Sequence, residues 1–150
     1  MAVKAIPDGY HAITPYLYFE QTRAAIDFYK TAFGAQERGV MDGPGGAVMH
    51  AELQIGDSVI MMADNADQAP SRLGGTAVSI LIYTEDVDAM FKRAIAKGAT
   101  SLAEPEDKFY GDRMGSLRDP FGHEWSIGTH IEDVSEEQMQ ERMAAMAPGG

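Results

Sequence analysis

The sequence predicts an α+β fold of two βαβββ modules followed by a C-terminal helix. The main observation is an internal repeat: Tyr18-x-Glu20 recurs as Tyr83-x-Glu85 at an offset of 65 residues. Gly34-Ala35 recurs as Gly98-Ala99 at an offset of 64. In each copy a strand-like run leads into a helix-like run and then into short strands. Such a repeat indicates two similar units that pack together, and their junction is a natural place for a ligand.

The first module, about residues 10–64, carries a local signal for each element. Thr22 is suited to cap a helix whose apolar residues recur at helical spacing, and Gly34 is a typical C-terminal stop. Residues 48–55 alternate with period two, which places His50 and Glu52 on one face of a strand. The expected elements are a strand at 13–19, a helix that follows Thr22 and stops at Gly34, and strands at 36–41, 48–55 and 58–63.

The second module, about residues 76–131, follows a polar segment at 64–75 that we expect to be a loop-like linker. Its helix shows apolar residues at helical spacing between Asp86 and Lys97. The expected elements are strands at 77–83, 100–102, 113–117 and 124–129, a helix at 86–97 and a loop at 104–111. We divide the chain into a domain at 1–134 and a C-terminal helix at 135–147.

The C-terminal helix has its own start signal, because Ser135 and Gln138 match a capping box. Met139, Met143 and Met146 lie on one side of it. Two interpretations remain open: a helix packed on its own domain, or a Met-rich arm on a partner subunit, since methionine suits adaptable contacts.

Composition limits the function classes. The 150 residues carry 12 Lys and Arg against 23 Asp and Glu, a formal net charge of −11, which argues against nucleic-acid binding. The absence of cysteine excludes disulfides, thiolate catalysis and zinc–thiolate sites. No apolar run is long enough for a membrane span, and the first residues lack an apolar signal core. We expect a cytoplasmic protein that contacts neither nucleic acid nor membrane.

Several motifs in order resemble the vicinal oxygen chelate superfamily, which contains glyoxalase I, extradiol dioxygenases and bleomycin-resistance proteins. Four stretches are similar to its PhnB-like branch, often labelled 3-demethylubiquinone methyltransferase-like, over about residues 10–134. The resemblance implies that the sheets of the two modules curl into a cup with the helices outside, and that modules often pair across two chains. The four stretches are Tyr10–Tyr16, His50–Ser58, Phe109–Arg113 and Asp119–His123.

The resemblance also implies where metal-dependent relatives hold a divalent cation, with His, Gln or Glu on the first and last strands of each module. The matching positions are Thr14, Met61, Ser79 and Ser126, and each pair is separated by 65 residues. Hydroxyl and thioether groups are poor ligands for such a cation, which prefers carboxylate, imidazole or carbonyl donors. We therefore predict no metal of the family type and no cofactor.

Other residues offer candidate chemistry. His50 and Glu52 share a strand face and are weak catalytic candidates, as a general base with its orienting group or as part of a non-standard metal site. A structural role for His50 is the alternative. Arg113 suits an anionic group and Tyr110 a ligand ring, whereas an Asp112–Arg113 contact that braces the loop is the competing interpretation.

Strand alternation from the four reference positions predicts the residues that face the cup. Together with the loop candidates, the predicted ligand-binding residues are Thr14, Tyr16, Met61, Ser79, Leu81, Tyr110, Arg113, Glu124 and Ser126. They give a pocket that is largely apolar with a few polar groups, as small-molecule sites are. Packing of these residues in the protein interior is the alternative.

The sequence thus predicts a small-molecule-binding protein, and we expect a homodimer. The alternative is an enzyme of the lyase, isomerase or dioxygenase type, dependent on a metal at His50 and Glu52 or metal-free. The methyltransferase label gains no support, because the chain lacks a Gly-rich strand-to-helix loop of the kind that holds a nucleotide-like cofactor.

Overall fold

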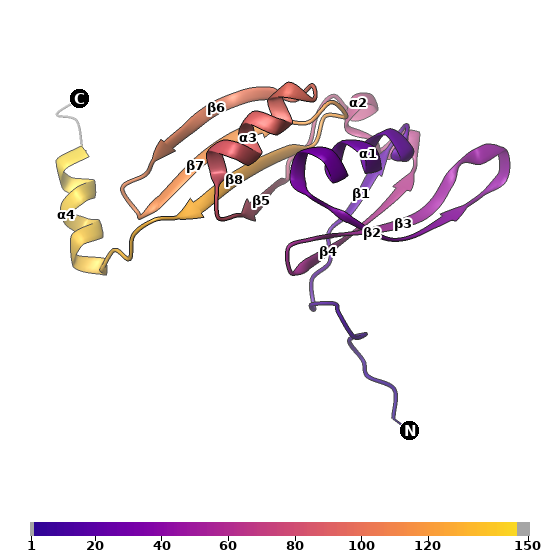
Figure 1. Ribbon diagram of the computed structural model, residues 1–150, viewed down its shortest axis with the longest axis horizontal. Coiled ribbons are helices and arrows are strands. Elements are labelled where there is room, and N and C mark those ends of the chain that lie inside the picture. Colours follow the sequence, from indigo (N-terminus) through magenta and orange to yellow (C-terminus); the bar gives the residue numbers. More distant parts are fainter. Residues whose placement is uncertain (1, 147–150) are drawn as a thin grey trace.

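The computed structural model describes residues 2–146 and contains two βαβββ modules (Figure 1). The first module comprises β1 (Tyr16–Phe19), α1 (Thr22–Phe33), β2 (Gln36–Asp42), β3 (Val48–Ile55) and β4 (Ser58–Asp64). The second comprises β5 (Ser79–Tyr83), α3 (Val87–Ala96), β6 (Thr100–Asp107), β7 (Asp112–Arg118) and β8 (Glu124–His130). The chain closes with α4 (Glu136–Met146), so the predicted fold class is confirmed.

Each module forms its own four-stranded mixed sheet, in the orders β1-β4-β3-β2 and β5-β8-β7-β6. In both, the first strand pairs in parallel with the last, and the remaining pairs are antiparallel. The two sheets extend away from each other on either side of the helices (Figure 1). A cup with both sheets as its walls is therefore not closed by a single chain.

The helices cover one face of each sheet. Along β1, the side chains of Leu17 and Phe19 are buried under the helices, whereas Tyr16 on the opposite face of the sheet is exposed to solvent. This is the period-two alternation expected of a strand. Helices α1 and α3 lie side by side and close a common core (Figure 1). We call the face of each sheet that carries no helix its open face.

The modules are joined by buried polar contacts as well as by apolar packing. The carboxylate of Asp119 accepts hydrogen bonds from the Tyr29 hydroxyl of α1 and, at 2.9 Å, from the indole of Trp125. The His123 Nε2 atom lies 2.9 Å from the carbonyl oxygen of Tyr18. Asp119 and His123 follow β7 closely in sequence, so the turn before β8 fixes the second module against the first.

Four local predictions need correction. Thr22 does not cap α1 but is its first residue, and its backbone N–H donates to the Asp64 carboxylate over 2.8 Å. Strand β1 is shorter than predicted, and β6 extends to Asp107, into the first part of the segment predicted as a loop at 104–111. The linker contains a short helix, α2 (Pro70–Leu73), preceded by a single 3-10 turn at Ala66–Gln68. Another 3-10 turn, at Pro44–Gly46, joins β2 to β3.

Helix α4 stands apart from the sheets (Figure 1), and none of its described residues is buried. The predicted capping box is present, because the Gln138 N–H and the Ser135 hydroxyl lie 3.1 Å apart and Gln138 Oε1 accepts from the Ser135 N–H at 3.1 Å. Arg142 of α4 contacts the domain, because its guanidinium binds Glu132 and the carbonyl of Phe109. Residue 147 of the predicted helix lies outside the described residues.

Among the helices within residues 2–146, none has the length and apolar composition needed to cross a membrane.

Candidate functional site

A row of side chains crosses the open face of the first sheet. Tyr16 on β1 lies opposite Met61 on β4, and Met61 lies opposite Glu52 on β3. Because paired residues of neighbouring strands point to the same face, these three side chains share the open face. Tyr16, rather than the predicted Thr14, therefore occupies the register position beside Met61.

A hydrogen-bonded chain runs along this row. The Tyr16 hydroxyl lies 3.0 Å from Nδ1 of His50, and Nε2 of His50 lies 2.8 Å from Oε2 of Glu52. The Tyr10 hydroxyl donates to the other carboxylate oxygen of Glu52. The chain thus brings together the predicted His50–Glu52 pair and two tyrosines.

Electrostatics fixes the charge states at the two ends of this chain. The hydrogen bond from Tyr10, together with His50, lowers the pKa of Glu52 despite the opposing effect of burial. Partial burial, followed by the influence of Tyr18 and Glu52, raises the pKa of Tyr16. At neutral pH, Glu52 is therefore a carboxylate and Tyr16 a neutral phenol.

The second sheet repeats the arrangement with different chemistry. Leu81 on β5 lies opposite Ser126 on β8, and Ser126 lies opposite Ser116 on β7. Leu81 and Ser126 follow Tyr16 and Met61 by 65 residues each, so the sequence repeat has the same register as the structural one. The two serine hydroxyls lie 3.2 Å apart.

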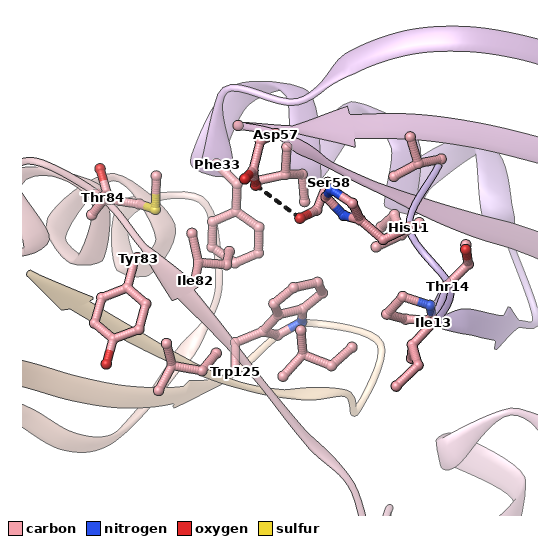
Figure 2. Close-up of a pocket in the computed structure, with 18 residues that line it drawn as sticks. His11, Ile13, Thr14, Phe33, Asp57, Ser58, Ile82, Tyr83, Thr84 and Trp125 are labelled. Carbon is pink, nitrogen blue, oxygen red and sulfur yellow. Dashed lines mark hydrogen bonds between the residues drawn. The ribbon is translucent and has the colours of Figure 1, made fainter. Parts of the chain in front are cut away.

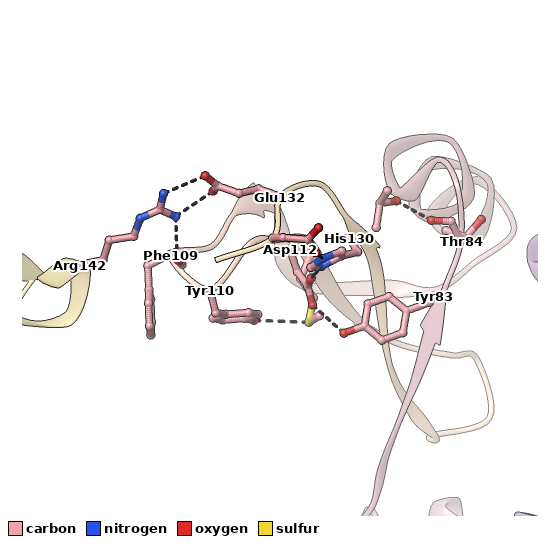
Figure 3. Close-up of polar contacts among 11 residues, drawn as sticks. Tyr83, Thr84, Phe109, Tyr110, Asp112, His130, Glu132 and Arg142 are labelled. Atoms are coloured by element: carbon pink, nitrogen blue, oxygen red, sulfur yellow. Dashed lines mark hydrogen bonds and ion pairs between the residues drawn. The ribbon is translucent and has the colours of Figure 1, made fainter. Parts of the chain in front are cut away.

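A second polar cluster lies at the other end of this open face (Figure 3). Asp112 is only 5% exposed; it accepts from the Tyr83 hydroxyl at 2.7 Å and its other oxygen lies 2.8 Å from Nδ1 of His130. The second ring nitrogen of His130 lies 2.8 Å from Asp133. Burial opposes ionisation of Asp112, but the bonds from Tyr83 and His130 outweigh it and lower its pKa. The bonds to Asp112 and Asp133 raise the pKa of His130.

One cavity, of about 710 Å³, borders the open faces of both modules. Tyr16 and Tyr18 contribute from β1, Ser79 and Leu81 from β5, and Glu124 from β8. Four of the predicted ligand-binding residues, Tyr16, Ser79, Leu81 and Glu124, therefore surround one space. The first sheet adds a smaller recess of about 370 Å³ beside it, lined by Tyr10, Arg38, His50 and Glu52 among others.

A separate cavity of about 810 Å³ lies at the seam between the modules, on the side of the helices (Figure 2). Phe33 and Trp125 stand in its middle, with His11 and Thr14 on one side and Thr84 on the other. Its apolar walls belong to the core that the modules share, and its nearby polar pair, Ser58 and Asp57, is bonded to itself over 2.9 Å. Thr14 thus faces the seam rather than the row of Tyr16.

The loop candidates lie away from the cavity that borders the open faces. Arg113 alternates to the helix side of β7, where its guanidinium binds both carboxylate oxygens of Asp88 on α3, at 2.9 and 3.0 Å, and Asp107 at 3.0 Å. Arg113 is thus held in ion pairs, and the residue that braces it is Asp88 rather than Asp112. The Tyr110 hydroxyl contacts the Met114 sulfur at 3.7 Å (Figure 3).

Sequence reasoning missed Tyr10, Tyr83, Asp112 and Ser116. For Tyr83 and Ser116, the signal was available in the alternation that placed Leu81 and Ser126 on the open face. For Asp112, the adjacent Arg113 suggested a local pair, whereas alternation sends the two side chains to opposite faces. No sequence signal pointed to Tyr10, which reaches Glu52 from the irregular N-terminal segment.

The donor set fits a divalent cation poorly. The register positions on the first and last strands of the modules hold Tyr16, Met61, Leu81 and Ser126, which supply neither carboxylate nor imidazole. Within residues 2–146, there is no group of three or more His, Cys, Asp or Glu side chains arranged to hold a metal ion.

Comparison with known proteins identifies relatives of the whole chain. The sequence profile described as Glyoxalase/Bleomycin resistance protein/Dioxygenase superfamily matches residues 11–127. An uncharacterised protein of Mycobacterium tuberculosis is 39% identical over 156 aligned positions, which span 99% of this chain and 89% of that protein.

Solved structures share the fold. A PhnB protein from Bacillus cereus superimposes with a TM-score of 0.63 at 20% identity, over 79% of this chain and 99% of that one. The fosfomycin resistance protein FosX from Listeria monocytogenes, complexed with Mn(II) and sulfate, gives a TM-score of 0.64 at 16% identity, over 89% and 97% of the two chains. At this identity, the likeness concerns the fold alone.

Proposed function

Because the chain belongs to the Glyoxalase/Bleomycin resistance protein/Dioxygenase superfamily, we propose that it binds a small organic molecule at its open faces without a metal of the family type. The observation that carries the proposal is the cavity of about 710 Å³ that both modules line. Its size suits a drug-sized ligand, and its walls combine apolar and aromatic side chains with a few polar groups. The cytoplasmic address expected from the sequence is part of the same proposal.

The choice of this cavity over the seam rests on its polar groups. Tyr16 and Glu124 reach it from different modules, and Tyr16 is held in place by His50. Polar groups that converge from several elements fix the orientation of a ligand. The seam cavity also has polar lining residues, among them His11 and Thr84, but the core side chains Phe33 and Trp125 stand in its middle.

The alternative is an enzyme of the lyase, isomerase or dioxygenase type. The favouring observation is the Tyr16–His50–Glu52 chain, in which a carboxylate orients an imidazole and the imidazole contacts an exposed phenol. Such a chain can accept or return a proton at the Tyr16 oxygen, which is the requirement for metal-free acid–base catalysis. A metal-dependent version would need further ligands beside His50 and Glu52.

Metal analysis of the purified protein, with His50→Ala as the control, separates these readings. Binding without a family-type metal predicts much less than one equivalent of divalent cation in both proteins. One equivalent in the wild type that disappears in His50→Ala would overturn the proposal and support a metalloenzyme.

A second experiment tests the metal-free enzyme: a panel of ketones is incubated with the protein in D2O and followed by NMR. Deuterium exchange next to the carbonyl that His50→Gln abolishes would favour catalysis.

We also propose that two copies of the chain form a dimer that covers this region. The residues around the cavity include large apolar side chains that a single chain leaves exposed, such as Ile13 at 86% and Val78 at 64%. Leu73 and Leu81 extend the same patch. A contiguous apolar patch of this kind marks an interaction surface. Sedimentation at micromolar concentration should give a dimer that Val78→Asp weakens, and a purely monomeric wild type would refute the arrangement.

A further inference from the structure

The hydrogen-bonded chain on the first open face has a direction, which Glu52 sets. A carboxylate only accepts hydrogen bonds, so both contacts to Glu52 must be donated to it. Tyr10 supplies one proton and Nε2 of His50 supplies the other. The carboxylate therefore selects the His50 tautomer that carries its proton on Nε2.

The His50 tautomer in turn determines the direction of the hydrogen bond between His50 and the Tyr16 hydroxyl. In this tautomer Nδ1 holds a lone pair and accepts a hydrogen bond. The Tyr16 hydroxyl, 3.0 Å away, must donate to it. The lone pairs of the Tyr16 oxygen are thereby left to accept a further hydrogen bond on the open face, and the Tyr16 side chain lines the cavity of about 710 Å³.

On the second open face, a tyrosine hydroxyl likewise donates its proton and keeps its oxygen as an acceptor. The Tyr83 hydroxyl lies 2.7 Å from Asp112, which accepts only, so its proton is also committed and its oxygen remains an acceptor (Figure 3). Glu124 lines the cavity of about 710 Å³ itself, whereas Glu52 lines the smaller recess of about 370 Å³ on the first sheet.

The positive groups beside these faces already have partners. The guanidinium of Arg118 lies 3.3 Å from Glu124, and that of Arg38 lies over the ring of Tyr10 and 3.3 Å from Gln54. His130 contacts two carboxylates, and Arg113 lies on the helix side. These cations are therefore paired, as is Glu124, whereas Glu52 receives hydrogen bonds from Tyr10 and His50 and keeps a negative charge on the first open face.

From this polarity we infer that the ligand is a hydrogen-bond donor: a primary amine, carried as ammonium, on an apolar or aromatic frame. An ammonium group donates to the Tyr16 oxygen, is attracted by the carboxylate of Glu52, and gains from the faces of Tyr16 and Tyr18. A carboxylate in the same place would meet acceptors and negative charge. The inference rests on the proposed function, because it names the ligand class of the same cavity.

Three matched probes test it: 2-naphthylmethylamine, 2-naphthylmethanol and 2-naphthoic acid, titrated into the full-length protein and followed by ligand-detected NMR. The amine should bind most tightly, with a Kd about tenfold or more below that of the acid. Equal affinities, or tighter binding of the acid, would overturn the ligand class while leaving a small-molecule function intact. If none of the probes binds at millimolar concentration, the proposed function fails as well.

Two variants with the same change in net charge locate the effect. Glu52→Gln removes the group that fixes the direction of the chain, whereas Glu137→Gln removes an exposed charge on α4. The amine-over-acid preference should fall roughly tenfold in Glu52→Gln and stay within about twofold of wild type in Glu137→Gln. An equal loss in both would show long-range attraction by the acidic chain and would overturn the local site.

The hydroxyl is tested by Tyr16→Phe, which keeps the ring and removes the oxygen. Amine binding should weaken about fivefold to tenfold, whereas the affinity for the alcohol should change less.

Nitrogen NMR of His50 gives a readout that does not depend on any ligand. The account requires a proton on Nε2 and none on Nδ1 at neutral pH. A proton on both nitrogens, or on Nδ1 alone, would contradict the direction of the chain.

Discussion

The carboxylate of Asp119, in the second module, accepts a hydrogen bond from the hydroxyl of Tyr29, in the first, and both side chains are buried. The same carboxylate accepts from the Trp125 indole and from the backbone N–H groups of Phe121 and His123. Burial, together with the neighbouring charge of Asp119, raises the pKa of Tyr29 well above its ordinary value, so the hydroxyl stays a donor. One side chain thus holds the turn before β8 and fixes it to α1.

Replacement of Asp119 should therefore destabilise the whole fold. In Asp119→Ala, buried donors lose their acceptor, and we expect a loss of about 2–4 kcal/mol in the free energy of unfolding, measured in urea. Asp27→Ala, at an exposed position of α1, is the matched control and should change stability by less than about 0.5 kcal/mol. A small effect in Asp119→Ala would show that apolar packing alone joins the modules.

Asp64 should make stability depend on acid. It accepts from the N–H groups of Thr22 and Val48, at 2.8 and 2.9 Å, and so ties the start of α1 to two strands. Burial opposes ionisation, but these bonds outweigh it and lower the pKa of Asp64 from 3.8. A lowered pKa in the folded state gives stability that is present above the unfolded value and is lost as pH falls through the folded one.

The comparison of wild type with Asp64→Asn measures this contribution. The wild type should be more stable near neutral pH, by about 1 kcal/mol as for other helix caps. That difference should shrink in urea titrations as the pH falls below about 4. A difference that does not change with pH would mean that Asp64 acts through packing alone.

His130 should have the opposite pH dependence. Its bonds to Asp112 and Asp133 raise its pKa, so its contribution is present below 6.5 and is lost as pH rises through the folded pKa. The wild type should exceed His130→Gln in melting temperature near pH 6 and lose that advantage toward alkaline pH. Added salt should weaken the effect, because the His130 side chain is exposed. An advantage that grows with pH would contradict the assigned pairing.

Arg113 should matter for stability and not for binding. Its guanidinium connects β7 to Asp88 of α3 on the side away from the open faces. Arg113→Gln should lower the melting temperature but change the Kd for 2-naphthylmethylamine by less than about twofold. A large loss of affinity would restore the ligand-binding role that the sequence suggested.

The sequence was informative where pattern and structure share a period. The alternation of His50 and Glu52, the 65-residue repeat and the helix stop at Gly34 depend on local geometry, and each corresponds to an observed element. The predicted binding residues that alternation placed, such as Tyr16 and Leu81, lie on the open faces.

The errors arose from contacts between distant segments. Thr22 has the chemistry of a cap, but it is the first residue of the helix, and its own backbone N–H donates to Asp64, which is distant in sequence. Arg113 looked free to bind an anion because Asp88 comes near it only when α3 packs on its sheet. The direction of the Tyr16–His50–Glu52 chain depends on two strands, β1 and β3, and on Tyr10, and no local pattern encodes it.

The most direct test of the central claim is a crystal structure of the protein with a small molecule that raises its melting temperature in a screen. The account predicts density in the cavity that Tyr16, Leu81 and Glu124 line, without a metal ion between ligand and protein. A ligand found only at the seam beside Phe33 and Trp125, or held by a metal at His50 and Glu52, would contradict it.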